Sequence, residues 1–80
     1  MFACDFVQAP PRGDPNHGSL LGTEKAGTAK QAISEAALLA IKAAKPGRIH
    51  GMVYTDDAVL ASHTGNSVEE VRQELLGAVS

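Results

Sequence analysis

Alanine supplies 13 of the 80 residues, and this limits the interior that the chain can build. Hydrophobic residues make up 44% of the sequence, but an alanine side chain buries little area, and tryptophan is absent. A chain of this length can bury only about 60% of the surface that it exposes when unfolded. We therefore expect one domain, residues 1–80, with a thin core.

The first residues alternate between apolar and other side chains, which is typical of a β-strand. Phe2, Cys4 and Phe6 share one face, and Asp5 lies on the other. Two prolines follow Ala9, and because proline donates no ladder hydrogen bond, the strand is predicted to end by Gln8.

Residues 9–27 are rich in proline and glycine and show no sustained period. This composition predicts a long loop, of the kind that is usually either functional or without fixed structure. Leu20 and Leu21 form an isolated apolar pair within it.

Two helices are signalled by capping boxes. Thr28 with Gln31, and Ser67 with Glu70, have the spacing in which a hydroxyl accepts from the amide three residues later. The first helix is predicted to run from residue 29 to the stop signal at 45–47, and the second from residue 68 towards the C-terminus. Apolar residues of the first helix share one face, namely Ile33, Ala36, Ala37, Ala40, Ile41 and Ala44. Leu38 falls among its polar residues.

Residues 48–55 and 58–64 are predicted to form a hairpin around Asp56 and Asp57. A two-residue turn there gives the opposing pairs Tyr54 with Val59, Met52 with Ala61, and His50 with His63.

These elements predict an α+β fold, a small β-α-β-β-α domain. We expect a three-stranded sheet with two helices packed on one face. No internal repeat is evident in the sequence.

His50 and His63 are the candidate metal ligands. Opposed residues in an antiparallel pair lie about 5 Å apart, so two imidazoles could share an ion. The spacing matches no established ligand pattern, and a one-residue slip would move one histidine to the other face. Paired surface histidines without metal are the favoured interpretation, so no metal and no cofactor are predicted.

Lys25, Thr28 and Lys30 are the candidate anion-binding residues. The segment from Gly22 to Ala29 is close to a phosphate-binding P-loop, but it has threonine at 28 where the pattern needs lysine. A binding site for a small anion or nucleotide at the helix start is therefore one alternative function.

Charge and chemistry argue against several other functions. The net charge is −2 and the seven basic residues are scattered, which disfavours nucleic acid as a partner. The single cysteine lies in an apolar strand, so neither a disulfide framework nor an activated nucleophile is indicated, and no enzymatic activity is predicted. The first residues do not resemble a signal peptide and no run is long enough to span a membrane, so a cytoplasmic location is expected.

The remaining feature is apolar surface beyond what a minimal core requires. The candidate partner-binding residues are Leu20, Leu21, Leu38, Met52 and Tyr54. The alternative is that they fill one ordinary core. The first interpretation predicts a non-enzymatic protein-interaction module, with another protein or a second copy as its partner.

One short segment resembles a known family. The stretch from Tyr54 to Ala58, followed by residues 65–70, resembles the hairpin and capped helix of HicB-type antitoxins. Nothing about function or functional residues is carried over from this resemblance. The length, the acidic balance and the lack of a catalytic set suit a phage- or mobile-element-type inhibitor or an antitoxin-like binder of another protein.

Overall fold

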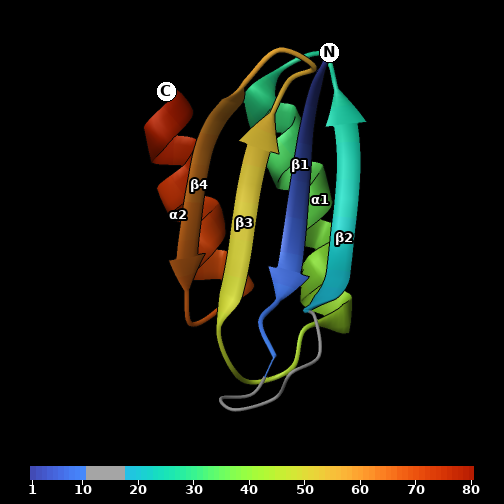
Figure 1. The fold of residues 1–80 in the computed structure, drawn as a ribbon, viewed down its shortest axis with the longest axis vertical. Coiled ribbons are helices and arrows are strands. Elements are labelled where there is room, and N and C mark those ends of the chain that lie inside the picture. The colour runs from blue at the N-terminus through green and yellow to red at the C-terminus, as the bar shows by residue number, and fades with distance from the viewer. Residues whose placement is uncertain (11–17) are drawn as a thin grey trace.

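Four strands and two helices form two layers, as Figure 1 shows for the computed structural model, which describes residues 1–10 and 18–80. The elements in chain order are β1 (Phe2–Gln8), β2 (Ser19–Ala26), α1 (Ala29–Ala43), β3 (Ile49–Tyr54), β4 (Val59–Gly65) and α2 (Val68–Val79). The strands form one antiparallel sheet in the order β2-β1-β3-β4. Both helices lie behind this sheet in Figure 1. The α+β class is confirmed.

The prediction of a three-stranded sheet is wrong, because the segment expected to be a loop contains β2. This strand pairs with β1 from Ser19 to Ala26, and a bulge at Leu21 interrupts the pairing. The bulge places Leu20 on one face of the sheet, while Leu21 packs against the core. Two adjacent leucines therefore hide the period-two pattern that reveals a strand. The part of the predicted loop at 11–17 lies outside the described residues.

The predicted hydroxyl-to-amide bond of each capping box is confirmed. Thr28 Oγ1 accepts a hydrogen bond from the Gln31 amide at 3.1 Å, and Ser67 Oγ accepts one from the Glu70 amide at 3.1 Å. In the second box the Glu70 carboxylate also accepts from the Asn66 amide at 2.6 Å. The two hydroxyl bonds satisfy amides that a helix start leaves without partners, whereas Asn66 precedes the cap residue of α2.

The core lies between the helices and one face of the sheet. Phe6, Ile33, Ile49, Val53, Val71 and Leu75 are its largest fully buried apolar side chains. Alanines of α1 allow a close approach to β2, where a Cβ on Gly22 would lie 2.8 Å from the carbonyl oxygen of Ala36. One detail of the predicted buried helix face is wrong, since Ile41 is 52% exposed.

The chain contains a structural repeat that its sequence conceals. Strands β1 and β2 followed by α1 form one ββα unit, and β3, β4 and α2 form a second. Leu21 is the extra residue in the first hairpin, and Leu60 occupies the same place in the second, 39 positions later. The helix caps Thr28 and Ser67 are separated by the same 39 positions.

The two units are related by an approximate two-fold axis perpendicular to the sheet. Strands β1 and β3 pair antiparallel at the centre, while β2 and β4 form the two edges. The axis therefore passes between the central strands and exchanges opposite corners of the sheet. The bulge and the helix cap of one unit each have a counterpart in the other.

Candidate functional site: the open face of the sheet

The candidate site is the face of the sheet that points away from the helices. Within the described parts of the chain, no helix or strand covers it (Figure 1). The strand register arranges its side chains in three rows across β2, β1, β3 and β4. The first row is Lys25, Ala3, Tyr54 and Val59; the second is Thr23, Asp5, Met52 and Ser62; the third is Leu20, Val7, His50 and Thr64.

An apolar stripe crosses this face diagonally. It consists of Leu20, Val7, Met52, Tyr54 and Val59. It runs from Leu20, at the β2 end of the third row, to Val59, at the β4 end of the first row. The two end residues, Leu20 and Val59, are 61% and 59% exposed. The approximate two-fold axis exchanges these ends, because Leu20 and Val59 occupy equivalent positions beside the two bulges.

A polar network holds the centre of the face in place. The Asp5 carboxylate accepts a hydrogen bond from Thr23 Oγ1 at 2.5 Å and another from the Tyr54 hydroxyl at 3.0 Å. The bond to Asp5 is the main reason why the pKa of Tyr54 lies above its ordinary value. Because the network joins β2, β1 and β3, the Tyr54 ring is presented in a defined position.

The structure brings three of the five predicted partner-binding residues together. Leu20, Met52 and Tyr54 belong to the apolar stripe. Leu21 packs against the core from its bulge, and Leu38 is 65% exposed on α1, in the other layer. Sequence reasoning missed the two valines of the stripe. The Tyr54–Val59 pair was predicted, and it could have drawn attention to Val59.

The predicted pairing of His50 with His63 is wrong. His50 pairs with Thr64 on the open face, where its Nδ1 lies 2.8 Å from Thr64 Oγ1. His63 pairs with Gly51 and points to the helix side. The bulge at Leu60 causes this shift, because one extra residue changes the face of every later side chain. Among the described residues, no group of three or more histidine, cysteine or acidic side chains is placed to hold a metal.

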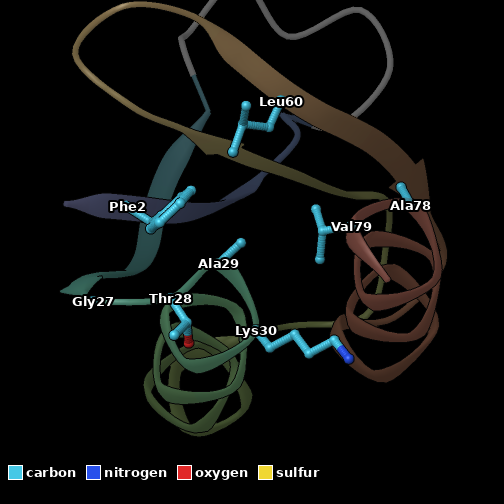
Figure 2. Close-up of a pocket in the computed structure, with 8 residues that line it drawn as sticks. All are labelled: Phe2, Gly27, Thr28, Ala29, Lys30, Leu60, Ala78 and Val79. Atoms are coloured by element: carbon cyan, nitrogen blue, oxygen red, sulfur yellow. The ribbon is translucent and has the colours of Figure 1, made fainter.

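The predicted anion-binding residues are divided between two surfaces. Lys25 lies on the open face, opposite Ala3. Thr28 and Lys30 line a groove of about 570 Å³ beside the start of α1, shown in Figure 2. The Thr28 hydroxyl accepts from the Gln31 amide, and in Figure 2 the Lys30 side chain extends towards α2. The lining is otherwise mostly apolar.

A second groove of about 370 Å³ occupies the equivalent place in the other unit. It lies beside the start of α2, and Glu69 stands where the first groove has Lys30. Both grooves lie where the start of one helix meets the end of the other. The repeat therefore accounts for the position of the two grooves.

Cys4 is fully buried, and burial, aided by the charge of Asp5, raises the pKa of its thiol to about 12. Because the thiolate is the reactive form, alkylation by iodoacetamide at pH 8 should be about a thousandfold slower in the folded chain than in urea. The single cysteine makes the measurement unambiguous by mass spectrometry. Equal rates in the two states would contradict the burial of this thiol.

Within the described ranges, neither helix is long and apolar enough to cross a membrane. No protein-family model, no curated protein and no solved structure matches this chain. The resemblance to HicB-type antitoxins therefore receives no support from these comparisons. The function has to be inferred from the geometry.

Proposed function

We propose that this chain is a non-enzymatic protein-interaction module that binds through the open face of its sheet. The apolar stripe is the observation that carries the proposal. Its ends, Leu20 and Val59, are 61% and 59% exposed, and it crosses all four strands, passing beside Asp5. Contiguous apolar surface of this kind marks interaction sites on folded domains.

The composition of the face supports a protein as the partner. Tyrosine and methionine are enriched at protein interfaces, and both lie in the middle of the stripe. Polar side chains border the stripe on both sides, among them Thr23 and Ser62. An apolar centre with a polar rim is the usual anatomy of such an interface.

The distribution of titratable groups is consistent with a binding role. The Asp5 carboxylate accepts hydrogen bonds from Thr23 and Tyr54. The Cys4 thiol is buried, and its pKa is raised. The two described histidines point to opposite faces of the sheet. An inhibitor or antitoxin-like function is one use that such a binding surface would serve, and it stays part of this proposal, as does a cytoplasmic location.

Affinity capture with charged variants tests the proposal. Leu20→Glu and Val59→Glu place a carboxylate at each end of the stripe, and each should reduce capture of partner protein about tenfold or more, a change of about 1.4 kcal/mol in binding free energy. The tagged chain is incubated with a lysate of the organism that encodes it, and bound protein is quantified by mass spectrometry.

Leu38→Glu is the matched control, because Leu38 is 65% exposed and Leu20 is 61% exposed, but Leu38 lies on α1. This variant should capture as the parent chain does, and circular dichroism should show the same thermal midpoint for all variants. If the two stripe variants capture the same proteins in the same amounts as the parent chain, the open face is not the binding surface.

A further inference from the structure

We infer that the partner on the open face is a second copy of this chain, packed face to face with its strands crossing at nearly a right angle. The inference rests on the proposed function, because it names what covers the same stripe. It follows from the direction of the stripe and from the uncharged corner that the rotation places over Lys25.

The direction of the stripe selects the packing angle. From Leu20 on β2 to Val59 on β4 the stripe crosses three strand spacings, about 14 Å, while it shifts four residues along the strands, about 13 Å. The stripe is therefore inclined at roughly 45° to the strands. Rotating a second copy by 180° about the stripe itself superimposes the two stripes and crosses the strands at roughly 90°.

A crossing near 90° is one of the two arrangements that packed sheets adopt. The same rotation uses the full length of both stripes, so Leu20 of one copy meets its own counterpart in the other. An aligned packing, at about 30°, would let the stripes cross only at their centres and would leave both ends exposed. The stripe thus matches orthogonal packing of two identical sheets.

The rotation places Lys25 and Asp5, the charged side chains of the rows described above, in different surroundings. It exchanges the two polar corners, so that Lys25 of one copy lies over the corner that holds Ser62 and Thr64 of the other. That corner is formed by β4, which carries no charged side chain. Lys25 can donate to hydroxyls there, and it does not meet its own counterpart. At the centre of the face, the same rotation brings Asp5 of one copy close to Asp5 of the other, and each carboxylate accepts hydrogen bonds from Thr23 and Tyr54 of its own copy.

The internal repeat gives the two ends of the apolar stripe the same character. Because the approximate two-fold axis exchanges Leu20 with Val59 and Val7 with Tyr54, the stripe has the same character when followed from either end. Rotation about the stripe places each end on its own counterpart, so the contacts at the two ends of the dimer are alike. The dimer would contain four ββα units.

The size of the face predicts a dimer that dissociates on dilution. Its three rows hold 12 side chains, whereas a standard interface involves about 20–30 residues on each side. We therefore expect a dissociation constant on the order of micromolar, as for small and transient interfaces.

Sedimentation equilibrium tests this inference. The parent chain should show the 8.3 kDa monomer at low concentration and twice that mass at high concentration. Leu20→Glu and Leu20→Lys should each be monomeric, because like charges would then face each other across the two-fold axis. Leu38→Glu is the control and should dimerise as the parent chain does.

A mixture of the two charged variants provides the decisive measurement. Equal amounts of Leu20→Glu and Leu20→Lys should form a heterodimer, because the charges that oppose self-association become complementary. Failure of the mixture to dimerise would overturn the arrangement in which Leu20 meets its counterpart. Dimerisation that persists in each variant alone would place the contact elsewhere, such as the β4 edge, and would also overturn it.

The proposed function and the proposed dimer can be tested separately. A parent chain that is monomeric at every concentration overturns the second-copy inference. If capture of a different protein is nevertheless lost in Leu20→Glu and kept in Leu38→Glu, the open face binds that protein and the proposed function stands.

Discussion

Replacing Phe6 by alanine is expected to lower the free energy of unfolding by about 3–5 kcal/mol. The Phe6 side chain is fully buried between the sheet and the helices, and it is one of the largest in the core. An alanine-rich interior has few long side chains that could move into the space left behind, so the cavity should persist. Urea denaturation followed by circular dichroism measures the change.

This loss would be severe for so small a domain. A chain of 80 residues is expected to have a total stability of about 4–12 kcal/mol. The Phe6→Ala variant should therefore be partly unfolded at 37 °C if the parent chain lies at the lower end of that range.

Phe2→Ala is the matched control for Phe6→Ala. Phe2 lies on the same strand and the same side of the sheet, but it is half-buried and borders the open groove of Figure 2. Its replacement should cost about 1–2 kcal/mol, because less surface is returned to water. Equal losses for the two variants would contradict the placement of Phe6 at the centre of the core.

Replacing Gly22 by alanine is expected to destabilise the chain by about 1–3 kcal/mol, even though a single methyl group is added. The new Cβ would lie 2.8 Å from the carbonyl oxygen of Ala36 and 2.9 Å from the amide nitrogen of Ala40. Both are backbone atoms of α1, so no side-chain rotation relieves the contact. The helix as a whole would have to move away from β2.

The sign of the stability change in Gly22→Ala distinguishes a close helix–strand contact from the intrinsic preference of the backbone. Alanine within a strand is ordinarily favoured over glycine by roughly 0.5–1 kcal/mol, because glycine loses more conformational freedom on folding. A destabilised Gly22→Ala variant would therefore report the close contact between α1 and β2. A variant as stable as the parent chain would show that the helix does not lie on this strand.

Gly77→Ala is the control for Gly22→Ala. Gly77 lies in α2, and an added Cβ there would meet no atom within 4 Å. Because alanine is the better helix former, this variant should gain up to about 1 kcal/mol. Opposite signs for the two substitutions, measured in the same denaturation experiment, would separate packing from backbone propensity.

Local signals in the sequence were sufficient for most of the secondary structure. The strand from Phe2 to Gln8 and the two helix starts were predicted at the residues where the structure has them. Capping depends on a side chain and an amide three residues apart, so the neighbouring sequence contains all of the necessary information. The exposure of Leu38 followed from helical periodicity in the same way.

The site was only partly predictable, because the bulges depend on tertiary packing. An extra residue at Leu21 is stable because its side chain packs against the core, and nothing in the neighbouring sequence signals this. The second bulge, at Leu60, moved His63 away from His50 and left Met52 opposite Ser62. A single inserted residue thus decided which side chains share the open face.

The sequence by itself determined the α+β class, the helix caps and the presence of more apolar surface than a minimal core requires. Only the tertiary structure decided that β2 exists, that the chain is two ββα units, and that Leu20, Val7, Met52, Tyr54 and Val59 form one stripe. The physical reason is the range of the interactions. Helix starts are stabilised within one turn, whereas strand pairing joins residues far apart in the chain, and its register is selected by the packing of the whole core.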